Sequence, residues 1–279
     1  MPSVADFLVS RSPSSVGLRG PGRWATTCAI ALVFALGCRE GPPAPTATPD
    51  SGDPGPPAVF PDGLYWSARD GGRVQHLRPD DGQVSTVLSG LSDPRGLVVT
   101  ANEVYLIDAG TEVLLRVPID GSPQQILTTT QGPGDLQRDG EDLVFTDRDQ
   151  GAIRRWTSAG TATDIVTGVF EPYFLDVSDG FVWWAEFDSS QLHRVPLTGG
   201  PIEDFDVDAR WLRDLVVAED YVTWSDRETG RIQRAPLPDL QPTEDLYVGM
   251  RTPHGLIQVD DDLYWTDTTT GQILSLIHI

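Results

Sequence analysis

The sequence is poor in cysteine and has no lysine, and each shortage narrows what the chain can do. Its two cysteines, Cys28 and Cys38, precede the part of the chain that repeats itself. That part therefore has no disulfide framework and no cysteine-based metal site. All 20 basic residues are arginine, against 41 acidic residues, for a net charge of −21. Such an acidic chain repels polyphosphates, so the composition argues against a nucleic-acid partner.

The sequence also lacks the common catalytic motifs. It has no Gly-x-Ser-x-Gly, no His-Glu-x-x-His and no glycine-rich phosphate-binding loop. Of its 4 histidines, His278 lies in the last six residues and His254 precedes a predicted strand. No nucleophile or base partner can be assigned to His254 from the sequence, so catalysis has little support.

Residues 1–58 have the composition of an export leader and a tether. An uncharged apolar run, residues 25–37, follows Arg19 and Arg23 and ends in Ala-Leu-Gly before Cys38. This pattern resembles the bacterial lipoprotein signal, although Ala35 stands where a larger aliphatic residue is usual. The resemblance implies a signal peptide over residues 1–37, lipidation of Cys38 and attachment to the outer membrane or cell surface. A plain cleaved signal is the alternative. Residues 38–58 are rich in proline and predict an extended tether.

From residue 59 the chain repeats a unit of about 40 residues six times. Each unit has a short aromatic or β-branched segment whose third residue recurs in register: Trp66, Leu106, Phe145, Trp184, Trp224 and Trp265. Eight residues further on stands an aliphatic residue: Val74, Leu114, Ile153, Leu192, Ile232 and Ile273. A leucine precedes each of the last five segments by seven residues: Leu97, Leu136, Leu175, Leu215 and Leu256.

These periods predict four short antiparallel strands per unit, joined by glycine-containing turns. A sheet of that size cannot bury both of its faces alone, so the copies must stack. Stacking around an axis gives an all-β fold, a β-propeller with six blades over residues 59–273.

The repeats resemble a known family. The segment LYWTD at residues 263–267 is similar to the repeated motif of the YWTD propellers, the class B repeats of low-density-lipoprotein receptors. Pro-x-Gly-Leu precedes it at Pro253–Leu256, and Ile-x-Arg follows the equivalent segment in other repeats of the chain. The resemblance implies a six-bladed ring in which the repeated aromatic and Asp residues are mostly architectural. It departs at Ala68 and Glu186, where the Asp is replaced. Because propellers have many activities, the resemblance specifies fold better than function.

The last six residues, LSLIHI, break the repeat. They match the in-frame translation of the mosaic-end adapter of transposase-based sequencing libraries. We therefore interpret residues 274–279 as an artefact that truncates the last blade, with a native apolar end strand as the alternative.

Ligands of propellers usually bind at the mouth of the central channel, on the loops that lead into the innermost strands. The candidate ligand-binding residues on those loops are Arg95, Asp135, Tyr173, Trp211, Arg213, Asp214 and His254. Variable side chains at fixed, ring-facing positions are typical of a recognition surface. Ordinary loop residues paired with neighbouring acids are the alternative interpretation.

Other conspicuous residues have structural explanations. Arginine recurs in step with the blades at Arg116, Arg155, Arg194 and Arg234, which indicates a shared structural role in pairing with an acid of the same or the adjacent blade. Most tryptophans occupy the repeated strand position, where packing explains them better than sugar stacking. Asp147-x-Asp149-x-Gly151 is faintly similar to a calcium loop but lacks the further ligands, so we predict no metal site and leave Ca²⁺ open.

We therefore predict a monomeric, membrane-anchored, exported propeller that binds a protein, peptide or glycan without catalysis. One alternative is a lactonase-like hydrolase or lyase that depends on a divalent metal. A second is a structural protein of the cell envelope, which predicts no ligand.

Overall fold

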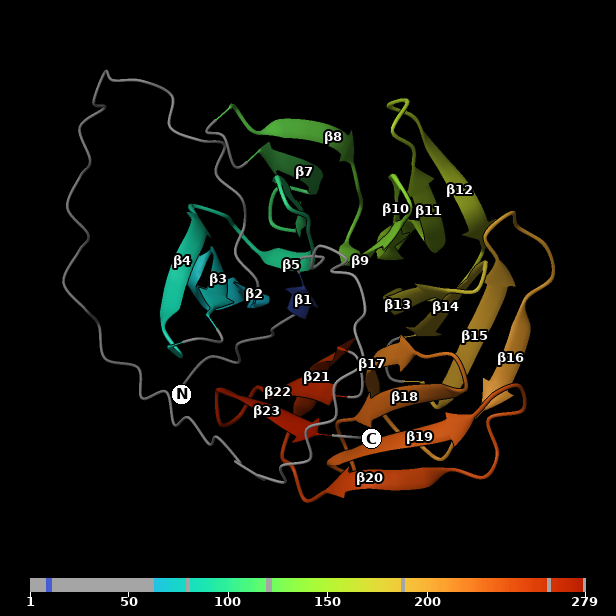
Figure 1. Cartoon of the computed structure of the whole chain (residues 1–279). Helices are drawn as coiled ribbons and strands as arrows, with labels where there is room; N and C mark the ends of the chain where they lie inside the picture. The colour runs from blue at the N-terminus through green and yellow to red at the C-terminus, as the bar shows by residue number, and fades with distance from the viewer. Residues whose placement is uncertain are drawn as a thin grey trace, which may run out of the picture.

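The computed structural model describes residues 9–11, 63–78, 81–118, 122–186, 189–259 and 262–277. Cys38, the predicted tether and His278 lie outside these residues. The described part forms six antiparallel sheets, arranged as blades around a central channel (Figure 1). The helical content of this part is two short 3-10 turns, η1 (Arg69–Gly71) and η2 (Arg148–Gln150). Within it no helix is long and apolar enough to cross a membrane.

The strands are named here from the channel outwards, blade by blade. Blades 1 and 2 contain β1 (Val9–Arg11), β2 (Leu64–Ala68), β3 (Arg73–Leu77), β4 (Val84–Ser89), β5 (Pro94–Val99), β6 (Glu103–Asp108), β7 (Val113–Pro118) and β8 (Gln125–Thr129). Blades 3 and 4 contain β9 (Pro133–Asp139), β10 (Asp142–Asp147), β11 (Ala152–Trp156), β12 (Ala162–Thr167), β13 (Pro172–Ser178), β14 (Phe181–Glu186), β15 (Gln191–Pro196) and β16 (Glu203–Asp206). Blades 5 and 6 contain β17 (Leu212–Val217), β18 (Tyr221–Asp226), β19 (Arg231–Pro236), β20 (Glu244–Val248), β21 (Pro253–Val259), β22 (Asp262–Asp267) and β23 (Gln272–Ile277).

The predicted register points lie opposite one another across neighbouring strands. Leu136 pairs with Phe145, Leu175 with Trp184, and the same pairing recurs in blades 2, 5 and 6. In each of these blades the leucine lies on the innermost strand, and its partner, which is an aromatic residue or Leu106, lies on the second strand. Because paired residues point to the same side of a sheet, both face a neighbouring blade. The predicted six-bladed propeller of four-stranded blades is thus confirmed, with three strands in the described part of the last blade.

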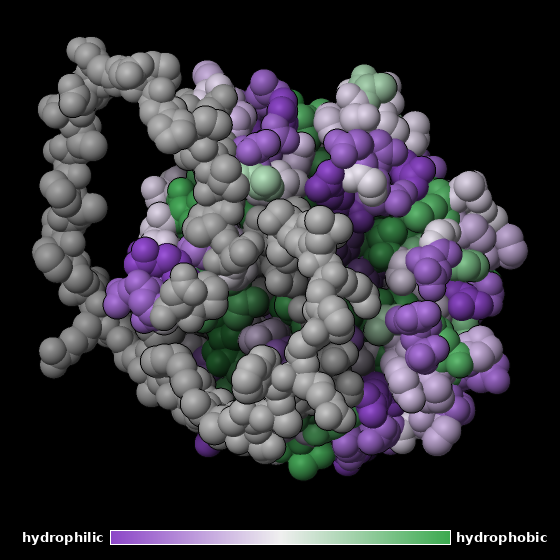
Figure 2. Space-filling model, viewed as in Figure 1, coloured by the Kyte–Doolittle hydropathy of each residue, from purple (hydrophilic) through white to green (hydrophobic). Residues whose placement is uncertain are grey.

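The core lies between the blades. The tryptophans at the repeated position, Trp66, Trp184, Trp224 and Trp265, are at most 3% exposed. This confirms that they pack inside the ring. The outward edges of the blades are mostly hydrophilic, and apolar residues show between the blades (Figure 2).

Strand β1 occupies the innermost position of blade 1, for which the repeat pattern offers no leucine. It pairs with β2 and contacts both β5 and β21, so its backbone closes the ring between blades 2 and 6. These three residues belong to the segment predicted as a leader. At the other end, residues 274–277 continue β23 in register with β22.

Candidate functional site at the channel mouth

The repeated motif acid fixes the loops that lead into the channel. The carboxylate of Asp108 accepts the backbone N–H groups of Ser92 and Asp93, and Asp226 accepts those of Arg210 and Trp211. In their own blades, Asp147, Glu186 and Asp267 each accept one backbone N–H from the corresponding loop, and the donors are Gln131, Phe170 and Arg251. Each acid ends the second strand of its blade and holds the loop before the innermost strand. The architectural role implied by the family resemblance is therefore borne out.

A second set of carboxylates joins one blade to the next. Oδ2 of Asp135 in β9 accepts the N–H of Leu175 in blade 4 at 3.1 Å. Oδ2 of Asp214 in β17 accepts the N–H of Leu256 in blade 6 at 2.6 Å. Both side chains are about 5% exposed or less, and each also accepts the N–H of its own following residue. Asp135 and Asp214, predicted as ligand contacts, are thus placed below the mouth in bonds between blades.

A third carboxylate, Asp176 in β13, completes the set. Its Oδ2 accepts the N–H of Val217 in blade 5 at 2.7 Å. Desolvation raises the pKa of Asp135 to about 7 and that of Asp176 to about 6, despite the N–H donors. Desolvation, and then the charge of Asp135, raise the pKa of Asp214 well above its usual value. No arginine contributes to these shifts, so the channel wall holds three acids that resist ionisation.

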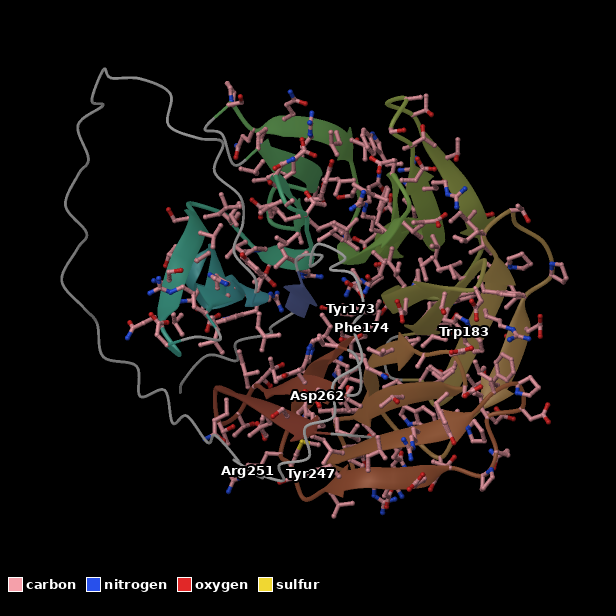
Figure 3. All side chains as sticks on the ribbon, in the orientation of Figure 1. Tyr173, Phe174, Trp183, Tyr247, Arg251 and Asp262 are labelled. Carbon is pink, nitrogen blue, oxygen red and sulfur yellow. The ribbon has the colours of Figure 1, made fainter. Side chains whose placement is uncertain are left out.

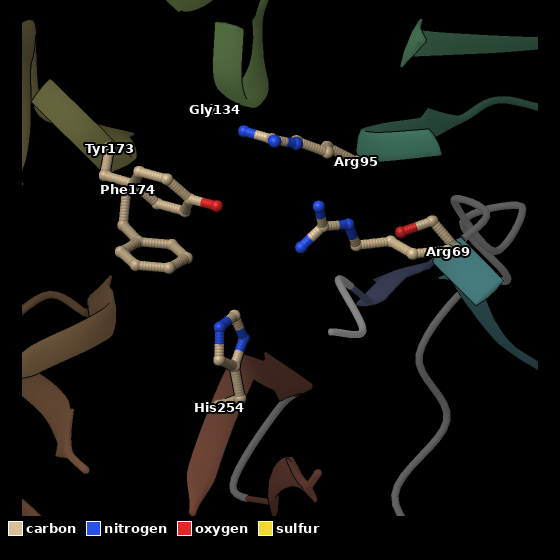
Figure 4. A pocket seen from close by; sticks show the side chains of 7 residues that line it. Arg69, Arg95, Gly134, Tyr173, Phe174 and His254 are labelled. Carbon is tan, nitrogen blue, oxygen red and sulfur yellow. The ribbon is translucent and has the colours of Figure 1, made fainter. Parts of the chain in front are cut away.

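A small pocket of about 10 Å³ lies at the channel mouth, with side chains from four blades (Figure 4). Arg69, Arg95, Tyr173 and His254 point into it, and Phe174 packs beside Tyr173. The remaining lining residues are Ser67 and Gly134. Figure 3 places Tyr173 and Phe174 at the centre of the ring, whereas Trp183 lies within its blade. Three of the predicted ligand-binding residues, Arg95, Tyr173 and His254, therefore share one pocket.

The two arginines are oriented by one carboxylate behind them. Arg69 and Arg95 both donate to Asp93, and Nη1 of Arg95 also donates to the carbonyl of Pro133. Burial favours a higher pKa for Asp93, but the hydrogen bonds and charges of the two arginines outweigh it and lower that pKa. Two guanidinium groups and one ionised carboxylate are thereby brought together among the described residues of the pocket, within a chain of charge −21.

Two further polar side chains belong to the pocket. The N–H of Gly255 donates to Nδ1 of His254 at 3.0 Å and so helps to orient the ring. Ser67 is 1% exposed, and its buried hydroxyl has no hydrogen-bond partner. A buried hydroxyl without a partner is unfavourable unless a ligand or a water satisfies it. The pocket therefore offers donors, cations and aromatic faces to an anionic group.

The other two predicted residues, Trp211 and Arg213, are not among the residues that line the pocket. Trp211 is 37% exposed, and the guanidinium carbons of Arg213 and Arg227 lie 5.8 and 5.9 Å from its ring centroid. Arg213 itself is buried. Of the seven predicted residues, three thus line the pocket, two form bonds between blades, and two form a separate tryptophan–arginine contact.

The sequence reasoning missed Arg69 and Arg148. Both follow the last residue of the five-residue motif, as Arg227 does, so the three recur in blades 1, 3 and 5. That alternation was a usable signal. The repeated strand arginines are structural as predicted: Arg116 pairs with Glu103, Arg155 with Asp139, Arg194 with Glu203 and Arg234 with Glu244, each within its own blade.

The faint calcium pattern has another role. Asp147 accepts the N–H of Gln131 and pairs with Arg154 at 3.2 Å, so its oxygens are engaged by the protein. Within the described residues no three His, Cys, Asp or Glu side chains are grouped so that they could hold a metal ion.

Comparison with known proteins supports the fold. No protein-family model and no curated protein matches the sequence. Among solved structures, the chain is similar to one in a nidogen/laminin complex, with a TM-score of 0.66, 16% identity, and coverage of 74% of this chain and 86% of that one. It is also similar to a catalytically inactive histidine-to-alanine variant of virginiamycin B lyase from Staphylococcus aureus with quinupristin. That comparison has a TM-score of 0.62 and 14% identity, and it covers 80% of this chain and 79% of that one. A third similar structure is that of a putative gluconolactonase, with a TM-score of 0.63, 16% identity, and coverage of 78% of this chain and 84% of that one.

All three identities are below 25%, so these likenesses concern the fold alone. They agree with the arrangement of the blades: the chain is a six-bladed β-propeller. Its neighbours in fold include both a binding protein and enzymes, so the fold does not choose between those functions.

Proposed function

We propose that this propeller is a non-catalytic binding module that recognises an anionic group at its channel mouth. The observation that carries the proposal is the convergence of Arg69 and Arg95 on a pocket that also contains the unpartnered hydroxyl of Ser67. Guanidinium groups bind carboxylates and phosphates with charge-assisted hydrogen bonds, and Asp93 orients both of these groups at the pocket.

Export and anchoring are part of the same proposal. The leader and Cys38 support a lipid anchor on a bacterial membrane, with the tether holding the propeller away from it. Replacing Cys38 by Ala should move the protein from the membrane fraction to the soluble exported fraction. Retention of Cys38→Ala on the membrane would refute the lipid anchor.

A thermal-shift screen with acetate, succinate, citrate, phosphate and sulfate tests the binding role. We expect at least one anion to raise the melting temperature, and Arg95→Gln to weaken its binding by about tenfold or more, since a hydrogen bond to a charged group is worth about 1.5–3 kcal/mol. Arg138→Gln is the matched control because Arg138 pairs with Glu141 on the surface, away from the pocket. Equal anion binding by both variants would refute the site. No binding by any anion would favour the structural envelope protein.

A hydrolase or lyase remains the second candidate, because His254 stands in the pocket beside Tyr173 and two fold neighbours are named as enzymes. Turnover of a lactone that is lost in His254→Ala, with or without added Ca²⁺, Mg²⁺ or Zn²⁺, would favour it. We expect no turnover, because the hydroxyl of Ser67 in the same pocket has no hydrogen-bond partner, so neither His254 nor another base is placed to activate it.

A further inference from the structure

A histidine of blade 4 lies between two carboxylates. Nδ1 of His193 in β15 lies 2.7 Å from Oδ1 of Asp204 in β16, and its Nε2 lies 4.0 Å from Oε2 of Glu186 in β14. His193 is 6% exposed and stacks on Trp184, with 5.2 Å between the ring centroids. The ring therefore spans the three outer strands of its blade, which lie side by side in Figure 1, and has an acid at each nitrogen.

The charged groups that face this ring are the two acids. They belong to the strands that pair with β15 on either side. Blade 3 packs against the same face of blade 4, and its residues that cluster with Trp184 are apolar: Val144, Ile153, Ile165, Val166 and Val169. A positive charge on the ring therefore has two opposite charges beside it.

The two nitrogens of the ring have different partners. An ionised carboxylate only accepts hydrogen bonds, so Nδ1 donates to Asp204 in either charge state of the ring. In the neutral ring the proton is then on Nδ1, and the buried Nε2, which has no hydrogen-bond partner, presents a lone pair to Glu186. In the protonated ring Nε2 also carries a hydrogen and donates toward Glu186. Only the protonated ring therefore attracts both acids.

The neighbouring blades have other polar residues at this position, directly after the repeated aliphatic residue. Arg154 in blade 3 pairs with the motif acid Asp147 at 3.2 Å and with Asp164 of the outer strand at 2.9 Å. Gln233 in blade 5 is neutral and donates to an acid of the outer strand at 2.8 Å. Blade 3 therefore has a permanently charged link between strands and blade 5 a neutral one, whereas His193 gives blade 4 a link that can change its charge.

Glu186 is also the residue that holds a loop at the channel mouth. Its Oε1 accepts the N–H of Phe170 at 3.0 Å. It stands where blades 2, 3, 5 and 6 have the shorter Asp, and its longer side chain places one oxygen at the loop while the other faces His193. Phe170 is 67% exposed, and Glu171 has a φ of 37°, which residues other than glycine rarely adopt. The connection at residues 168–171 therefore depends strongly on hydrogen bonds such as this one.

We propose that His193 is a pH-sensitive switch for the connection at residues 168–171. Histidine is the side chain that normally changes its charge between about pH 5 and 8. At the acidic end of this range the protonated ring holds Glu186, which in turn holds the N–H of Phe170. At the alkaline end the lone pair of Nε2 faces the carboxylate, Glu186 loses this support, and the connection opens more often. The inference goes beyond the proposed function and does not rest on it, because it concerns the loop without any ligand.

The test is hydrogen exchange of the Phe170 amide in the full chain. Exchange is measured by NMR and expressed as a protection factor, which removes the intrinsic effect of pH on the exchange rate. We expect the protection factor to fall by about tenfold between pH 5 and pH 8, since the hydrogen bond to an oriented carboxylate is the one that weakens.

The Arg210 amide is the internal reference. It donates to Asp226 at 3.0 Å in blade 5, where Gln233 occupies the place of the histidine. A change in the stability of the whole ring acts on both amides, so the ratio of the two protection factors reports the switch alone.

His193→Gln and His193→Arg place the residues of the neighbouring blades at this position. The Gln variant should show the low protection of the parent at pH 8 throughout the range, and the Arg variant the high protection of the parent at pH 5. If His193→Arg does not fold, His193→Gln decides the matter alone. A ratio that is equal at pH 5 and pH 8 in the parent, or that keeps its pH dependence in His193→Gln, would overturn the proposal.

Discussion

Raising the pH from 5 to 8 should destabilise this propeller through the buried acids of the channel wall. A carboxyl whose pKa is higher in the folded than in the unfolded chain gives stability that is complete below the unfolded pKa. That stability is lost as the pH rises through the folded pKa. Asp135 has a folded pKa of about 7 against an ordinary value of 3.8. Linkage then gives a loss of about 2.5 kcal/mol between pH 5 and pH 8 from this residue alone, with Asp176 and Asp214 acting in the same direction.

The assay is urea unfolding at pH 5, 6, 7 and 8, followed by tryptophan fluorescence. Asp135→Asn isolates the effect, because it keeps the size of the side chain and removes its titration. At pH 5 the variant should be less stable than the parent by about 1–3 kcal/mol, since the amide cannot accept both N–H groups. At pH 8 this difference should shrink or reverse.

Glu219→Gln removes an exposed carboxylate and controls for the general effect of the negative charge. It should leave the slope of stability against pH nearly parallel to that of the parent. An Asp135→Asn variant with the same slope as the parent would refute the reasoning, because the buried carboxyl would then not be the group that titrates.

Two other predictions follow from the packing of the ring. Gly96→Ala should lower the free energy of unfolding by several kcal/mol, because the added Cβ would lie 2.4 Å from the backbone nitrogen of Leu136 in the next blade. Gly140→Ala, whose Cβ would have nothing within 4 Å, should lower it by only about 1 kcal/mol. Denaturant unfolding measures both, and equal losses of stability would contradict the close approach at Gly96. Arg194→Gln should lower the free energy of unfolding by about 1–3 kcal/mol in the same assay. The guanidinium carbon of Arg194 lies 4.9 Å from the ring centroid of Trp183, and its Nη2 pairs with Glu203. A loss of stability no larger than that of Arg138→Gln would contradict a structural role for Arg194.

The repeat spacing predicted the fold well because it reports local structure. The offset between Leu175 and Trp184 fixes which residues pair across a hairpin, and a hairpin is a contact close in sequence. Stacking of the blades then followed from the need to bury both faces of each sheet.

The site was predicted less completely, because its decisive contacts are distant in sequence. Arg95 lies two residues before the repeated leucine of its blade and Asp135 one residue before that of the next blade. Both positions precede the innermost strand core, yet Asp135 accepts an N–H 40 residues away and Arg95 lines a pocket. Arg148 follows the motif as Arg69 and Arg227 do, but its contact with Tyr173, in the next blade, is not part of that pattern. Such differences depend on how neighbouring blades meet, which the pattern within one repeat does not contain.

The bonds between blades all point forward along the chain. Asp135, Asp176 and Asp214 each accept an N–H from the blade that is translated next. During synthesis, a blade that has just left the ribosome therefore holds a carboxylate whose second partner has not yet been made. Blade 3 completes its contacts only once residue 175 has emerged, and blade 5 only after residue 256. Each of these three blades therefore depends on the blade that follows it in the chain to complete the hydrogen bonds of its own carboxylate.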